Sequence, residues 1–80
     1  MSAGSLRIYD PGVGGTFCRV LISESPHYAG YLAVSVLYAT GKGPAIATNL
    51  KSSESDAISW AEDWLAKKYG GTPKLGVALP

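Results

Sequence analysis

The feature that most constrains the fold of this chain is a single, strongly marked helix signal in its last third. Ser53, followed three residues later by Asp56, resembles a capping box with Asp in place of Glu. Acidic residues occupy the first turn and lysines the last, as the helix dipole favours. Gly70 and Gly71 supply a stop, and Pro73 prevents the helix from resuming. The sequence therefore predicts one helix over residues 54–69.

The apolar residues of this helix fall on one stripe at about 100° per residue. Trp64 lies at the shoulder of the stripe, and Trp60 lies about 110° from its centre. The stripe consists of Ala57, Ile58, Ala61, Leu65 and Tyr69. A helix of this length extends about 24 Å, which is enough to cover one face of a small sheet and no more.

The chain before the helix is typical of strands separated by tight turns. Residues 6–9, 16–23, 31–40 and 45–50 are rich in β-branched and apolar side chains. Glycine and proline punctuate the segments between them. We therefore predict one α+β domain over residues 1–80, with residues 1–5 flexible. Its sheet is an antiparallel meander of three to four strands, with the C-terminal amphipathic helix packed on one face.

The end of the chain alternates apolar residues at Leu75, Val77 and Leu79. This alternation indicates a short final strand over residues 74–80, which pairs either within the chain or with another chain.

Alternation along the strands divides their side chains between two faces of the sheet. We assign to the helix-covered face Cys18, Val20, Ile22, Leu32, Val34, Val36, Tyr38, Ile46 and Leu50. The second face receives Phe17, Arg19, Leu21, Tyr31, Ala33, Ser35, Leu37, Ala39, Ala45, Ala47 and Asn49. Arg19 is the only charged residue of that second set, whereas a solvated sheet face normally alternates with polar residues. Something other than the helix should cover it.

Two arrangements could cover the second face. A second copy of the chain could do so, because symmetric dimers are the commonest oligomers and a small domain gains stability by assembly. Alternatively, the first strand, the long loops and the C-terminal tail could fold over it. The first arrangement predicts an interaction surface made of the second face and the Trp60 flank of the helix. Its residues are Phe17, Arg19, Leu21, Tyr31, Leu37 and Trp60.

Composition excludes several functional classes. One Cys and one His provide neither an internal disulfide nor a four-ligand zinc site, so we predict no metal and no cofactor. Seven basic residues against six acidic ones argue against a protein that coats nucleic acid. We expect neither a signal peptide nor a membrane span, and the lone thiol suits a cytoplasmic protein.

The sequence contains one combination of residues that could support nucleophilic catalysis. Cys18 could act as nucleophile and His27 as base, with Asp10 orienting the base. Cys18, however, falls on the core face, where a thiol is usually inert packing. The glycines of residues 10–15 match neither a dinucleotide fingerprint nor a Walker A loop. We therefore predict that the protein is not an enzyme.

The function expected from the sequence is a non-enzymatic interaction module that works as a homo-oligomer or with a protein partner. One alternative is a nucleic-acid-binding domain that uses Arg7, Arg19 and Lys42. The other is a small-ligand-binding domain with an aromatic pocket between the helix and the sheet.

Overall fold

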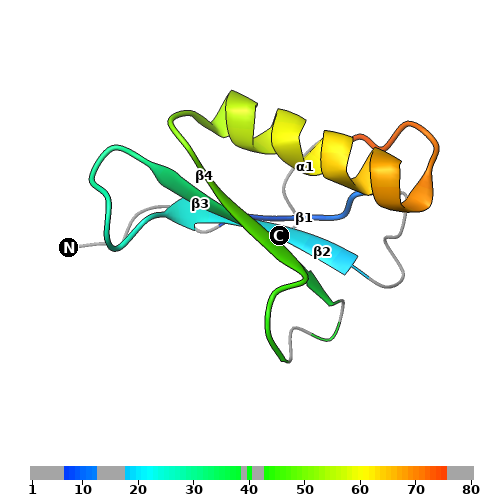
Figure 1. Cartoon of the computed structure of the whole chain (residues 1–80), viewed down its shortest axis with the longest axis horizontal. Coiled ribbons are helices and arrows are strands. Elements are labelled where there is room, and N and C mark those ends of the chain that lie inside the picture. Colours follow the sequence, from blue (N-terminus) through cyan, green and yellow to red (C-terminus); the bar gives the residue numbers. More distant parts are fainter. Residues whose placement is uncertain (1–6, 13–17, 39, 41–42, 76–80) are drawn as a thin grey trace.

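A computed structural model describes residues 7–12, 18–38, 40 and 43–75 of the chain. Four strands form one antiparallel sheet in the order β1-β2-β3-β4, and helix α1 packs across it (Figure 1). The strands are β1 (Arg7–Tyr9), β2 (Cys18–Glu24), β3 (Leu32–Tyr38) and β4 (Ala47–Lys51), and the helix is α1 (Glu54–Tyr69). The predicted α+β meander with one C-terminal helix is confirmed, with four strands in its sheet.

Local hydrogen bonds define both ends of α1, which has the predicted bounds. The Ser53 Oγ accepts a hydrogen bond from the Asp56 N–H at 3.1 Å, as an N-cap residue does. At the other end Gly70 has a φ of 79° and its N–H donates to the Ala66 carbonyl at 2.8 Å. Glycine adopts this left-handed conformation without the steric cost that a Cβ imposes.

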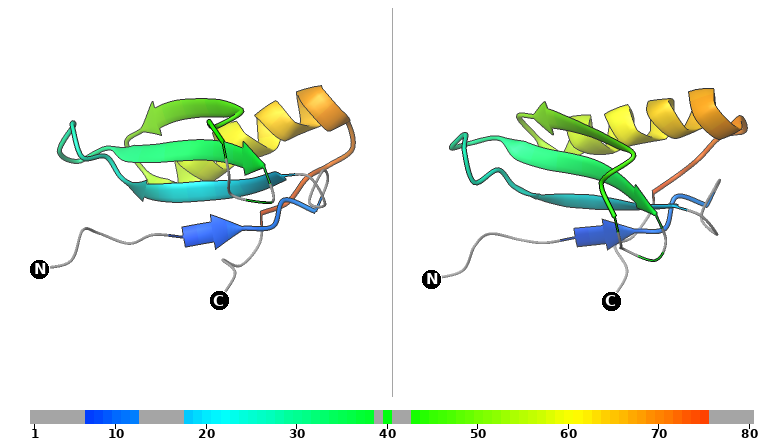
Figure 2. Two further views of the ribbon diagram at one scale, coloured as in Figure 1. Left: turned by 90° about the horizontal axis from the view of Figure 1, so that it is seen from below. Right: turned by 60° about the horizontal axis from the view of Figure 1, so that its bottom comes forward.

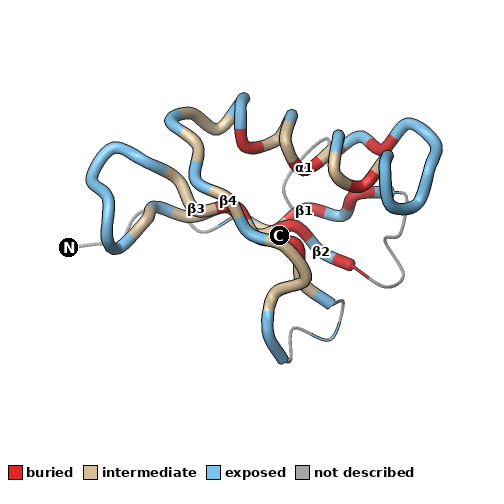
Figure 3. The backbone as a smooth tube through the Cα atoms, viewed as in Figure 1, coloured by how far each residue is buried: buried red, intermediate tan, exposed pale blue. Residues whose placement is uncertain are grey.

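The hydrophobic core lies between the sheet and α1. Two views along other directions show that the helix covers one face of the sheet (Figure 2). Alternate residues of β2 and the centre of β3 are buried against three residues of the helix stripe, and the tube in Figure 3 is red where these elements face one another. The buried hydrophobic residues are Tyr9, Cys18, Val20, Ile22, Val34, Val36, Ala57, Ala61, Leu65 and Leu75.

The start of the C-terminal tail joins this same core. Pro73 is buried, and the Leu75 side chain is 2% exposed within the core cluster. The Leu75 N–H donates to the Glu62 Oε2 at 3.0 Å, which fixes the tail against α1. Residues 72–75 have no strand pairing, and the rest of the predicted final strand, residues 76–80, lies outside the described residues. As far as Leu75, therefore, the tail completes the helix-covered face of the sheet.

The register of β4 corrects one part of the predicted faces. Asn49 pairs with Val34 and Ala47 pairs with Val36, so Ala47 and Asn49 lie on the helix side. Leu50 therefore points to the other face, where it is 39% exposed. The predicted alternation placed Ile46 and Leu50 together on the helix-covered face. Ile46, however, precedes the strand and packs against the core from there, so its position does not set the alternation of β4.

Candidate interaction surface

The face of the sheet opposite α1, called the open face here, carries side chains from all four strands. The strand register places on it Ile8, Arg19, Leu21, Ser23, Ala33, Ser35, Leu37, Thr48 and Leu50. None of these residues is buried, whereas every alternate position of β2 from Cys18 to Ile22 is buried on the helix side. Arg19 is the only charged residue among them. The described part of this face thus combines five apolar side chains with three hydroxyl side chains and one charge, and it is partly or fully exposed.

A loop at one end of the sheet turns the open face into a groove. Residues 25–30 connect β2 to β3, and the Ser25 Oγ accepts hydrogen bonds from the backbone N–H groups of His27 and Tyr28 at 3.2 Å each. A cavity of about 480 Å³ lies between this loop and the ends of β3 and β4. It is lined by Ser25, Pro26, His27, Tyr28, Ala33, Ser35, Thr48, Asn49 and Leu50. Small side chains form its floor, and the 58% exposed Tyr28 contributes to its wall.

The structure brings three of the six predicted interaction residues together. Arg19 pairs directly with Leu37 across β2 and β3, and Leu21 lies two residues further along β2 on the same face. Phe17 lies outside the described residues. Leu50 and residues 25–28, which also line the groove, are absent from the predicted interaction surface. Correct alternation of β4 would have identified Leu50, but the loop's position depends on three-dimensional packing.

Trp60 and Tyr31 lie apart from the open face. Trp60 is half-buried and packs against the core on the helix side. Tyr31 precedes β3, where its N–H donates to the Tyr28 carbonyl and its own carbonyl accepts from the Ser25 N–H. Its ring, 47% exposed, lines a second cavity of about 480 Å³ shared with residues 52–54 at the start of α1. The predicted interaction residues thus belong to more than one surface.

The flank of α1 that carries its two tryptophans faces the β4 side of the sheet. Glu54 binds Arg7 of β1, and Glu62 binds the tail, so one flank of the helix faces the β1 side. Trp60 and Trp64 lie on the opposite flank by helical spacing. Lys68 places its Nζ 5.9 Å from the centre of the Trp64 ring, a cation–π contact that further covers this flank.

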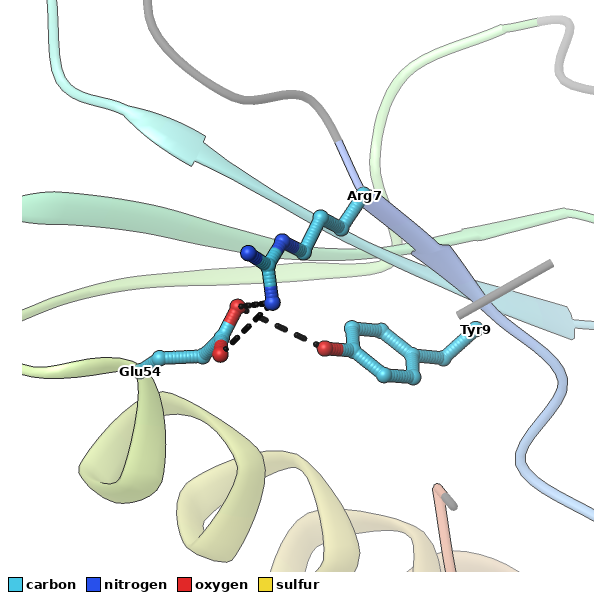
Figure 4. A network of polar contacts seen from close by, with 3 residues as sticks. All are labelled: Arg7, Tyr9 and Glu54. Carbon is cyan, nitrogen blue, oxygen red and sulfur yellow. Dashed lines mark hydrogen bonds and ion pairs between the residues drawn. The ribbon is translucent and has the colours of Figure 1, made fainter. Parts of the chain in front are cut away.

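Arg7 forms an ion pair with Glu54 at the start of α1 (Figure 4). Its Nη1 lies 2.8 Å from the Glu54 Oε2 and donates a hydrogen bond to Oε1 at 2.9 Å, while the Tyr9 hydroxyl donates to Oε2 at 3.4 Å. This cluster lies on the helix side, because Arg7 pairs with Ile22 and Tyr9 with Val20. Arg7 and Arg19 therefore lie on opposite faces and form no common basic patch, and Lys42 lies outside the described residues.

The residues considered for nucleophilic catalysis are not brought together. Cys18 is fully buried on the helix side, and its Sγ lies 3.1 Å from the Tyr69 hydroxyl oxygen. His27 lines the groove on the opposite side of the sheet. Asp10 accepts a hydrogen bond from the Gly12 N–H at 2.9 Å within its own turn. The sheet separates the thiol from the imidazole, so these two groups cannot exchange a proton directly.

The described residues offer neither a metal site nor a membrane-spanning helix. No three His, Cys, Asp or Glu side chains in this part of the chain gather in a way that could hold a metal ion. None of the described helices has the length and apolar character needed to cross a membrane. Comparisons with protein-family models, curated proteins and solved structures found no match for this chain.

Proposed function

We propose that this chain is a non-enzymatic interaction module that associates with a second copy of itself through the open face of its sheet. The observation that carries the proposal is the unequal cover of the two faces. Helix α1 and Leu75 both pack on the helix side, while none of the described residues of the open face is buried and Arg19 is their one charge. Removal of apolar surface of this kind from water lowers the free energy and so favours association.

The size of the face determines the kind of association. Seven-residue strands at about 3.3 Å per residue and about 4.8 Å apart give a face of roughly 20 Å by 15 Å. This is smaller than the roughly 800 Å² that each partner buries in a standard interface. We therefore propose a reversible dimer that depends on protein concentration, with the 25–30 loop adding to the contact. The free thiol of Cys18 supports a reducing, cytoplasmic setting for it.

Sedimentation velocity over about 1–500 µM tests the proposal, because a micromolar dimer dissociates across this range. We expect the mean sedimentation coefficient to rise with concentration. Leu21→Lys places a charge at the centre of the open face and should abolish this rise. Ser59→Lys adds the same charge on the exposed side of α1 and should leave it unchanged. A wild-type chain that stays monomeric at the highest concentration would refute the proposal.

A further inference from the structure

The side chains of the open face are arranged so that two copies of the face complement each other in one orientation. Its middle row crosses the whole sheet, because register joins Ile8 to Leu21, Leu21 to Ser35 and Ser35 to Thr48. The large side chains of Arg19 and Leu37 lie on one side of this row, two positions further along their strands. On the other side, also two positions away, lie Ser23, Ala33 and Leu50. Of these, Ser23 and Ala33 on the central strands are small.

The groove lies on the side of the small residues. Ala33 and Leu50 line it together with the loop that carries Pro26 and Tyr28. Its volume of about 480 Å³ exceeds what any single aliphatic side chain of this face needs, and it is a shallow groove that is open to solvent. One end of the open face therefore carries the large side chain of Leu37, and the other end is hollowed at Ala33.

We propose that the second copy docks with a two-fold axis that crosses the strands along the middle row, so that Leu37 of each copy enters the groove of the other above Ala33. This inference rests on the proposed function and specifies its geometry. Such an axis reverses the strand direction and leaves each strand facing its own counterpart. Since Ser35 lies midway between Ala33 and Leu37, Leu37 of one copy comes over Ala33 of the other.

The single charge of the face favours this axis over one that runs along the strands. An axis along the strands would leave both Arg19 side chains at the same end of the interface, and like charges close together are destabilising. The crossing axis sends them to opposite ends, about 13 Å apart along the strands and about 10 Å apart between the sheets. That separation exceeds the Debye length of about 8 Å at physiological salt. Each Arg19 then lies over Ser23 of the other copy, beside the loop that carries Tyr28.

Exchange of the large and small residues tests the geometry by sedimentation velocity. Leu37→Ala removes the large side chain that enters the groove in this geometry, and Ala33→Leu fills the groove, so each alone should raise the dimer Kd about tenfold or more. The double variant Ala33→Leu with Leu37→Ala places a leucine opposite an alanine again. We expect it to bring the Kd back to within about threefold of the wild type. Ser59→Leu, on the exposed side of α1, serves as the control for an added apolar side chain.

The outcomes separate this inference from the proposed function. A wild-type monomer would overturn both. A wild-type dimer that neither single variant weakens would overturn the geometry alone, because another surface would then form the dimer. Two weakened single variants with no recovery in the double variant would show that residues 33 and 37 do not meet across the interface. Far-UV circular dichroism establishes whether each variant folds. If Ala33→Leu does not fold, Ala33→Val repeats the test with a smaller side chain.

Discussion

Replacement of Leu75 by alanine tests whether the start of the C-terminal tail is part of the core. Leu75 follows α1 by six residues, has no strand partner, and yet is 2% exposed among residues of the sheet and helix. Alanine removes most of this buried side chain and leaves a cavity where it packed. Substitutions of this kind typically cost 2–5 kcal/mol, through lost transfer free energy and the cavity together.

The expected loss is a large part of the stability of so small a domain. At about 0.05–0.15 kcal/mol per residue, 80 residues have a free energy of unfolding of roughly 4–12 kcal/mol. A loss of at least about 2 kcal/mol should lower the Tm by about 8 °C or more, since each kcal/mol shifts the Tm of a domain this size by about 4–8 °C. Leu75→Ala should therefore unfold at a markedly lower urea concentration, although the backbone N–H of residue 75 keeps its hydrogen bond to the half-buried Glu62.

Urea unfolding followed by far-UV circular dichroism measures this loss. All variants are compared at one low protein concentration, because self-association would add to the apparent stability. Lys74→Ala is the matched control, since Lys74 is the exposed neighbour and its truncation should change the free energy of unfolding by less than about 0.5 kcal/mol. A Leu75→Ala variant as stable as Lys74→Ala would refute the packing of the tail in the helix-side core.

Two further predictions concern the end of α1. Gly70→Ala should lower the free energy of unfolding by about 1 kcal/mol in urea titrations, because an alanine is strained at a φ of 79°. An added Cβ would meet no atom within 4 Å, so no steric clash adds to this loss. Ser59→Ala, within the helix, is the control and should be near neutral. The hydrogen bond with Cys18, and then burial, raise the pKa of Tyr69 above 10.0. The neutral phenol is thus favoured in the fold, and stability present below pH 10 should be lost as pH rises through the folded-state pKa. Urea unfolding between pH 9 and 11 should show a smaller alkaline loss in Tyr69→Phe; an equal loss in both proteins would contradict the Tyr69–Cys18 interaction.

Elements with strong local signals were predictable from the sequence. The bounds of α1 follow from Ser53 and Gly70, whose capping bonds involve residues no more than four positions away. The faces of β2 and β3 follow from unbroken alternation, and Val20 and Val34 are buried as that alternation predicts. In these segments propensity, periodicity and turn residues all favour the same structure, so no knowledge of distant contacts was needed.

Features that depend on distant contacts were not predictable in the same way. Five residues of β4 contain too few apolar positions to define a face, and the assignment of Leu50 to the helix-covered face was wrong. Leu75 belongs to an apolar alternation typical of a strand, but its partners are α1 and the core. The groove wall is formed by polar and turn residues of the 25–30 loop, whose position beside β3 and β4 appears only in three dimensions.

The core and the proposed dimer interface lie on opposite faces of the sheet, and this separation gives the strongest joint test. Leu75 fills the helix side, whereas Leu37 lies on the open face beside Arg19. Effects at sites with no shared partners usually add within about 0.5 kcal/mol. Leu75→Ala should therefore lower the stability of the monomer without changing which residues meet across the dimer, and Leu37→Ala should do the reverse. If Leu75→Ala altered the dimer Kd as strongly as Leu37→Ala in a folded protein, the interface would include the helix side, and the open face could not be the sole docking surface.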